Sequence, residues 1–407
     1  MVSLKLEEMR VAESRLMEYA HRYAEVGENA YEMQLFDTEI PGDVVPLAAN
    51  KNKKNPPPLT VHGIHVWNKE KSAEESAQPP LVLVHGYANG ALYFYRNFVG
   101  LARSFPHIYS LDWLGWGLSS RPKFRLEDSS TETTEAFFVE SLEAWRRANK
   151  IPKMVLAGHS IGGYLSVAYC ERYPQHVDKL ILLSPAGVKE ETPLDRDRIQ
   201  RWREQSGLMG KTALSIIPKL FDMGITPCSV LRIVPESVGY GWVTNYVERR
   251  LPEITSSDER RAIADYLYQN ASLPGSGEFA LNRILQVNTI ARYPLVSRIP
   301  RLKIPQVTFL YGDSDWMDSR GGLDVQSRCS QIAGAPQIQV LEVPRAGHLL
   351  MLENYELFNA GVVLGGLGPS ALSAYAPRPR LLLPRRSQNL AFPNIGNARP
   401  PSVSIQG

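Results

Sequence analysis

The pentapeptide Gly158-His159-Ser160-Ile161-Gly162 places one serine between two glycines, after one apolar run and before another. A G-x-S-x-G pattern between a strand and a helix is typical of a nucleophile elbow, a sharp turn that exposes the serine hydroxyl. Side chains at Gly158 and Gly162 would crowd such a turn, so we expect both glycines to support it. We predict that Ser160 is a catalytic nucleophile; the alternative is a glycine-rich turn with an incidental serine.

A serine hydroxyl is a weak nucleophile until a base takes its proton. In proteins with this elbow, the serine is followed along the chain by an acid and then by a histidine. His176 follows Ser160 too closely, at the end of the next helix. His348 lies much further on, in VPRAGHLLML, directly after an apolar run. We predict that His348 is the base.

The acid is expected in VTFLYGDSDWMD, after the preceding apolar run. Asp315 is our first candidate because a tight G-x-x-D turn puts it at the tip of the loop, on the same edge as Ser160. Asp318 is the second candidate and Asp313 the third; either one could instead cap the turn. A carboxylate at this position orients the imidazole and stabilises its protonated form.

Ester chemistry at a serine also needs hydrogen-bond donors for the oxyanion that develops on the substrate. We predict two backbone donors, the N–H of Tyr87 in VLVHGYANGALYFYRNF and the N–H of Ile161 after the nucleophile. His85 is expected to support this loop rather than to take part in chemistry, and Asn89 and Gly90 fit simple turn positions.

Six short apolar runs, several of which end in glycine, predict the elements that position these residues. Helix-like stretches lie between most of them, and this alternation indicates a mostly parallel sheet with helices on both faces. The carboxyl ends of parallel strands form the usual ligand-binding edge of such a sheet, and the candidate residues lie there. The six runs cover residues 81–87, 107–117, 153–160, 179–187, 307–313 and 338–348.

The alternation predicts the division of the chain. Residues 1–59 are expected to hold an N-terminal helix, ending near Val26, and a linker, and residues 60–187 the first part of the core, opening with a strand. Residues 188–300 are predicted to form a helical insertion that covers the strand ends as a lid. The segment TALSIIPKLFDMGITP within it is apolar on one side, and such a side fits either core packing or a membrane contact. Residues 301–364 complete the core, and 365–407 are expected to be a disordered, basic, proline-rich tail.

The composition limits the other classes of function. A net charge of +3 over 407 residues, with 21% charged residues, does not indicate a nucleic-acid partner. Cys170, Cys228 and Cys329 lie far apart, and histidines and cysteines do not cluster, so we expect neither disulfides nor a metal site. No cofactor is predicted. We find no targeting segment and no apolar stretch near the roughly 18 residues that a membrane span needs.

Four segments together resemble one branch of the α/β-hydrolases. They are HGYANGALYFYRNFVGLARSF, SLDWLGWGLSSRP, GHSIGGYLSVAYCERYPQHVDKLILLSPAGV and YGDSDWMD. The branch holds the lipid-droplet lipase coactivator, the N-acyl-phosphatidylethanolamine lipase and the fungal cardiolipin-specific deacylase. The resemblance runs from about residue 60 to 360 and is closest to the plant and fungal members. It implies an α/β-hydrolase fold with a helical lid.

The resemblance implies a phospholipid or lysophospholipid acyl hydrolase. Members carry an H-x-x-x-x-D motif linked to lysophosphatidic acid acyltransferase activity; here Glu353 stands five residues after His348 in place of the aspartate. The coactivator lacks the nucleophile that Ser160 supplies, so a non-catalytic scaffold is the weaker alternative. We expect a cytoplasmic protein peripheral to membranes or lipid droplets, with mitochondria among the candidate membranes. The oligomeric state stays open.

Overall fold

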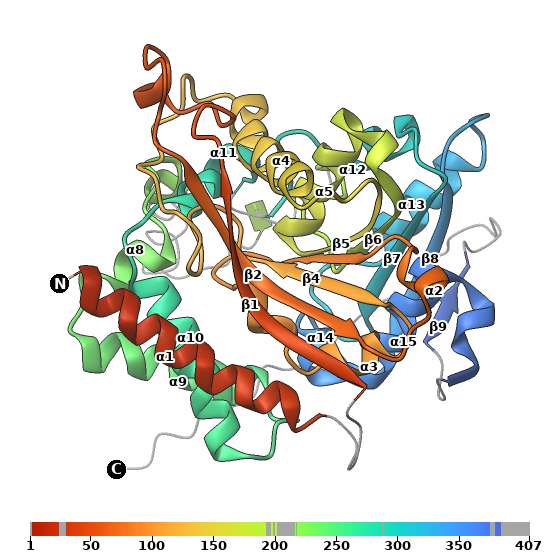
Figure 1. Ribbon diagram of the computed structural model, residues 1–407. Coiled ribbons are helices and arrows are strands. Elements are labelled where there is room, and N and C mark those ends of the chain that lie inside the picture. The colour runs from red at the N-terminus through yellow and green to blue at the C-terminus, as the bar shows by residue number, and fades with distance from the viewer. Residues whose placement is uncertain are drawn as a thin grey trace.

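A nine-stranded sheet organises the protein, in the order β1-β2-β4-β3-β5-β6-β7-β8-β9 (Figure 1). The computed structural model describes residues 2–23, 30–192, 197, 200, 201, 216, 218–286, 289–374 and 379–383. The six strands from β4 to β8 in this order are parallel, and β1, β2 and β9 pair antiparallel at the two edges. The strands are β1 Tyr31–Ile40, β2 Leu59–Asn68, β3 Leu81–Val84, β4 His107–Leu111, β5 Met154–His159, β6 Val177–Leu183, β7 Gln306–Gly312, β8 Gln337–Val343 and β9 Arg380–Leu382.

Helices cover both faces of the sheet, as Figure 1 shows. One face carries α4 (Thr131–Ala148), α5 (Ile161–Arg172), α12 (Leu295–Arg298) and α13 (Arg320–Cys329). The other face carries α3 (Phe98–Ala102), α14 (Leu350–Glu353) and α15 (Tyr355–Leu367), while the short α2 (Ala73–Ser76) precedes β3. Each inner strand therefore lies between two layers of helices.

The central strands are apolar throughout because both of their faces are buried. Along β5, Met154 and Leu156 belong to the hydrophobic core on one face of the sheet, and Val155 and Ala157 belong to the core on the other. All four side chains are at most 1% exposed. Successive side chains of a strand point to opposite faces, so a run with no polar alternation fits between two helical layers.

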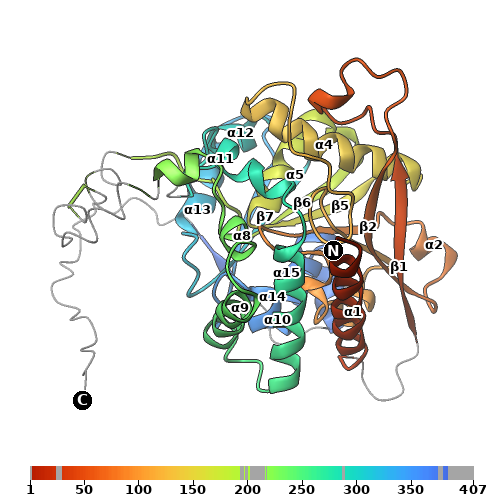
Figure 2. The ribbon, with the colours of Figure 1, turned by 90° about the vertical axis from the view of Figure 1, so that its left-hand side faces the viewer.

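The helical insertion between β6 and β7 lies over the carboxyl edge of the sheet. Its described helices are α8 (Pro227–Leu231), α9 (Glu236–Arg250), α10 (Ser257–Ser272), α11 (Leu281–Ile284) and α12. The N-terminal helix α1 (Val2–His21) packs along α10, and Figure 2 shows the two helices side by side. No helix among the described residues is long and apolar enough to cross a membrane.

The α/β-hydrolase fold predicted from the sequence is confirmed: each of the six apolar runs overlaps one of the parallel strands, and 60–70 overlaps β2. Two predicted segments differ. The expected linker after α1 contains β1, and α1 ends at His21 rather than near Val26. The expected disordered tail begins with ordered chain, because α15 runs to Leu367 and β9 pairs with β8. Residues 384–407 lie outside the described residues, and the other domain boundaries stay predictions.

Candidate active site

Ser160 stands at the turn between β5 and α5 with φ 55° and ψ −119°, a left-handed conformation that residues other than glycine rarely adopt. The neighbouring glycines make room for this turn. A Cβ at Gly158 would lie 2.5 Å from the Gly162 carbonyl oxygen, and a Cβ at Gly162 would lie 2.4 Å from the His85 carbonyl oxygen. The two glycines therefore support the elbow through close backbone packing.

The serine, the histidine and the first-choice acid meet in one chain of hydrogen bonds. His348 Nε2 lies 3.2 Å from Ser160 Oγ, and His348 Nδ1 lies 3.2 Å from Asp315 Oδ1. The Asp315 side chain is fully buried, and its Oδ1 also accepts a 2.9 Å hydrogen bond from the Met317 amide. An imidazole held on one side by a carboxylate can accept the serine proton on the other side.

The two other candidate acids are occupied elsewhere. Asp318 pairs with Lys189 and, through Oδ2, with Arg320 Nε at 2.8 Å. These partners hold the pKa of Asp318 below its usual range despite the opposing effect of burial. Asp313 accepts hydrogen bonds from the Arg345 and Ala346 amides at 3.0 and 3.3 Å, and so caps the turn after β7. The structure brings only Asp315 of the three to His348.

The loop after β3 lies directly against the nucleophile. A Cβ at Gly86 would lie 2.9 Å from the Cβ of Ser160. In the part of the chain that the structure describes, neither the Tyr87 amide nor the Ile161 amide donates a backbone hydrogen bond. Both Tyr87 and Ile161 line the cavity at Ser160.

His85 holds this loop in place. Its Nδ1 donates to the Gly86 carbonyl oxygen at 2.7 Å, and its Nε2 accepts from the Trp113 amide at 3.1 Å. Burial lowers the pKa of His85 to about 4, so the ring is neutral near pH 7. His85 thus has the supporting role that the sequence suggests. Asn89 and Gly90 lie in the same loop, and Asn89 also lines the cavity.

His348 is held in position by two residues, His159 and Glu353, that the sequence analysis does not assign to the site. The His159 Nε2 donates to the His348 carbonyl oxygen at 2.9 Å, and burial, with the nearby His348, holds the pKa of His159 well below its usual range. The Glu353 carboxylate accepts a hydrogen bond from the Gly347 amide. Burial raises the pKa of Glu353 although this hydrogen bond opposes it. The variable position of G-x-S-x-G and the H-x-x-x-x-E spacing are the sequence signals that could have pointed to these two residues.

A cavity of about 690 Å³ opens at Ser160 and His348. Its walls are mostly apolar and come from both the core and the insertion. Three aromatic residues of the lining are partly exposed: Trp242 is 49% exposed, Tyr246 39% and Trp316 54%. The Trp316 ring centroid lies 4.8 Å from that of His348. Other lining residues are Ala186, Pro227, Cys228, Val230, Leu231, Val243, Leu267, Ala271, Leu281, Leu285, Met317 and Leu349.

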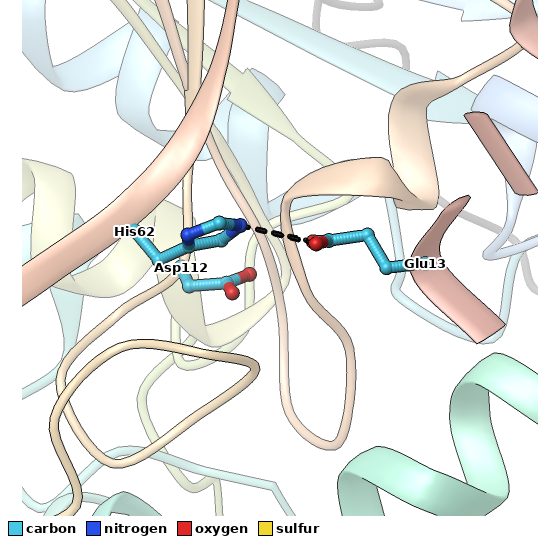
Figure 3. Close-up of side chains that lie close together, drawn as sticks. All are labelled: Glu13, His62 and Asp112. Carbon is cyan, nitrogen blue, oxygen red and sulfur yellow. Dashed lines mark hydrogen bonds and ion pairs between the residues drawn. The ribbon is translucent and has the colours of Figure 1, made fainter. Parts of the chain in front are cut away.

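A second cluster, Glu13, His62 and Asp112, brings metal-ligating atoms within 4.8 Å of one another (Figure 3). His62 Nε2 lies 3.1 Å from Glu13, and its Nδ1 lies 2.7 Å from Asp37. Burial alone would lower the pKa of His62, but Glu13, Asp112 and Asp37 together raise it to about 9. The imidazolium itself is the cation of this cluster, and we assign it no metal.

The comparisons with known proteins agree with the fold. Residues 79–355, more than half of the chain, match the family model described as the alpha/beta hydrolase fold. The chain is 33% identical over 312 residues to a probable 1-acylglycerol-3-phosphate O-acyltransferase of Oryza sativa subsp. japonica, covering 74% of this chain and 71% of the relative. It is 32% identical over 319 residues to the human 1-acylglycerol-3-phosphate O-acyltransferase ABHD5, covering 76% and 83%.

Among solved structures, the fold is similar to that of a membrane phospholipase A described as a bacterial virulence factor. The TM-score is 0.51 at 19% identity, over 86% of this chain and 89% of that one. This likeness concerns the fold alone. The sequence resemblance to the lipase-coactivator branch is confirmed by the named relatives from plants and mammals. The chain thus belongs to the alpha/beta hydrolase family, in the branch that includes ABHD5.

Proposed function

We propose that the protein is a serine-dependent acyl ester hydrolase that acts on glycerophospholipids or lysophospholipids. The observation that carries the proposal is the hydrogen-bonded chain from Ser160 through His348 to Asp315, which opens into an apolar cavity. An apolar cavity of this size suits an acyl chain, since burial of each methylene contributes about 0.8 kcal/mol.

In the proposed reaction, Ser160 Oγ attacks the ester carbonyl while His348 Nε2 takes the hydroxyl proton. The amides of Tyr87 and Ile161 donate to the oxyanion of the tetrahedral intermediate. The intermediate collapses when His348 gives its proton to the leaving glycerol oxygen, which leaves the acyl group on Ser160. Water, deprotonated by His348, then attacks the acyl ester and releases the fatty acid.

Acyl transfer to lysophosphatidic acid is the second candidate. The names of the plant and mammalian relatives favour it. The same acyl-enzyme serves both reactions, because a lysophospholipid hydroxyl can replace water as the acceptor. Transfer dominates only where the acceptor occupies the site and water is excluded. A purely non-catalytic scaffold would need no such alignment of serine, histidine and aspartate.

We further propose that the protein works at the periphery of a membrane or lipid droplet in the cytoplasm. Besides the partly exposed aromatic side chains at the cavity, the insertion exposes apolar residues. Met223 is 75% exposed and Ile233 is 82% exposed. Apolar side chains that stay in contact with water do not stabilise the protein. A lipid surface would bury them and would bring the substrate to the mouth of the cavity.

A fluorophosphonate probe tests the serine chemistry. We expect the wild type to be labelled, Ser160→Ala to remain unlabelled, and Ser330→Ala, which removes an exposed hydroxyl at the end of α13, to be labelled like the wild type. Folded wild-type protein that stays unlabelled with and without lipid would contradict the proposal. A phospholipid panel with and without lysophosphatidic acid then separates the two reactions by their products, free fatty acid or phosphatidic acid.

A further inference from the structure

One buried amide side chain connects the helical insertion to the loop that carries the proposed oxyanion donor. Asn270, on α10, is 1% exposed. Its Nδ2 donates to the Asn89 carbonyl oxygen at 2.8 Å and, at 3.4 Å, to that of Ala88. Its Oδ1 accepts from the Gly117 amide at 2.9 Å and from Arg121 Nη2 at 2.7 Å. The amide thus joins α10 to two loops at the carboxyl edge of the sheet.

The loop that Asn270 contacts contains a residue in an unfavourable backbone conformation. Ala88, the residue after Tyr87, has φ 59°, in the left-handed region that is unfavourable for a residue with a Cβ. Such a conformation persists only where partners fix it. On the core side, Asp112 Oδ1 accepts from the Ala91 amide at 2.6 Å. On the insertion side, Asn270 donates to the carbonyl oxygens of Ala88 and Asn89, the two residues after Tyr87.

The helix that carries Asn270 is itself anchored at both ends. Near its start, Glu259 pairs with Arg96 at 3.0 Å and accepts a hydrogen bond from Tyr23 at 2.7 Å. Near its end, Lys5 of α1 donates to the Ser272 carbonyl oxygen at 3.2 Å. In Figure 2, α1 lies along α10. This part of the insertion is therefore a fixed support for the catalytic loop.

We propose that Asn270 is a positioning residue for the oxyanion hole: it holds the Ala88–Asn89 backbone so that the Tyr87 amide points at the substrate oxygen. The proposal rests on the proposed serine acyl chemistry, because only reactions that pass through an oxyanion at Ser160 need the Tyr87 donor. Removal of one oxyanion donor typically lowers kcat by about 10²–10³-fold. A donor that is displaced rather than removed should lower kcat by about 10- to 100-fold.

Two variants of Asn270 separate the role of its Nδ2 donor from that of its Oδ1 acceptor. Asn270→Ala removes all of its hydrogen bonds. Asn270→Asp keeps an acceptor for Gly117 and Arg121 but has no donor for Asn89. With a soluble short-chain ester, we expect both variants to lower kcat about 10- to 100-fold, with KM within about 3-fold of the wild type. Gln269→Ala changes the preceding residue, which does not touch the loop, and should keep the wild-type kcat. A merely structural role would leave Asn270→Asp close to the wild type, and that result would overturn the proposal.

Two ligands distinguish the oxyanion hole from the cavity. An alkyl trifluoromethyl ketone forms a hemiketal with the serine and places an oxyanion in the hole, whereas a fluorescent fatty acid fills the cavity without a tetrahedral centre. We expect the inhibition constant of the ketone to rise about 10- to 100-fold in Asn270→Asp and the fatty-acid Kd to stay within about 2-fold. Equal weakening of both ligands, or an unchanged ketone constant, would overturn the proposal.

Amide hydrogen exchange of residues 86–93 gives a readout that does not depend on activity. Faster exchange in Asn270→Ala than in Gln269→Ala supports the positioning role, and unchanged exchange overturns it. A ketone that inhibits neither the wild type nor Ser160→Ala would instead refute the proposed hydrolase function. The two failures are therefore distinguishable.

Discussion

The Glu353 carboxylate accepts a hydrogen bond from the backbone amide of Gly347, the residue immediately before His348. A Cβ on Gly347 would also lie within 3.3 Å of that carboxylate. This contact bears on the two candidate reactions, because Glu353 occupies the last position of the H-x-x-x-x-D spacing that the resemblance links to acyl transfer. Its position in the structure is that of a support for the histidine loop, from which both reactions would benefit equally.

We therefore predict that Glu353 substitutions change hydrolysis and transfer in parallel. Glu353→Gln keeps an acceptor oxygen for Gly347 and should retain both activities within about 3-fold. Glu353→Ala leaves the partly buried Gly347 amide without its partner, at a cost of about 1 kcal/mol in loop stability, and should lower both activities about 10-fold. Fatty acid and phosphatidic acid measured in one assay give the comparison. Selective loss of transfer in Glu353→Gln would mean that the carboxylate itself acts on the acceptor.

The identity of the catalytic acid gives a second prediction. Asp315→Asn should lower kcat by about 10⁴-fold, because an amide stabilises the wrong histidine tautomer and does not stabilise the imidazolium. Asp318→Asn removes only a partly exposed pair with Lys189 and Arg320, each such pair contributing about 0–1 kcal/mol, and should leave kcat near the wild-type value. Steady-state kinetics of both purified variants decide the matter. A large loss of kcat in Asp318→Asn together with a near-wild-type kcat in Asp315→Asn would make Asp318 the acid.

A third prediction concerns the apolar surface of the insertion. Met223→Glu and Ile233→Glu place charges on highly exposed apolar positions and should weaken co-sedimentation with anionic phospholipid vesicles, while hydrolysis of a soluble ester stays within about 2-fold. The matched control is Ile332→Glu, at a residue that is 49% exposed. Ile332 lies in the loop before β8, at the opposite end of the strands from Ser160, so its charge should leave vesicle binding unchanged. Equal binding by all four proteins would exclude this surface as the membrane contact.

The sequence predicted the local features well because their signals are local. The elbow around Ser160 is readable from five residues, and the buried parallel strands are readable as apolar runs. β1 is hard to distinguish from a linker because Tyr31–Ile40 carries four acidic or amide side chains among its apolar ones, as an edge strand with exposed positions can. β9 was missed because only three residues pair with β8.

The supporting residues of the site could not be predicted because their contacts join distant parts of the chain. Asn270 reads as one polar residue in an amphipathic helix until the fold brings it to Asn89, 181 residues earlier. The choice of Asp315 over Asp318 also depended on where the turn after β7 points each carboxylate. Such choices are made by tertiary packing, which a single sequence pattern does not record.

The His62 cluster leads to a prediction of pH-dependent stability. The pKa of His62 is raised from 6.5 to about 9 in the folded protein, so its ion pairs stabilise the fold fully below pH 6.5 and lose this contribution as the pH rises through about 9. The shift corresponds to about 3 kcal/mol. We expect urea denaturation to show that the stability difference between the wild type and His62→Gln shrinks from pH 6.5 to 9.5, because the variant has no charge to lose. Asp112, whose pKa burial raises to about 6, is ionised over most of this interval in the wild type. A stability difference that stays constant with pH would show that His62 is neutral in the folded protein. The contact between His62 and Glu13 of α1 would then be an ordinary hydrogen bond and not an ion pair.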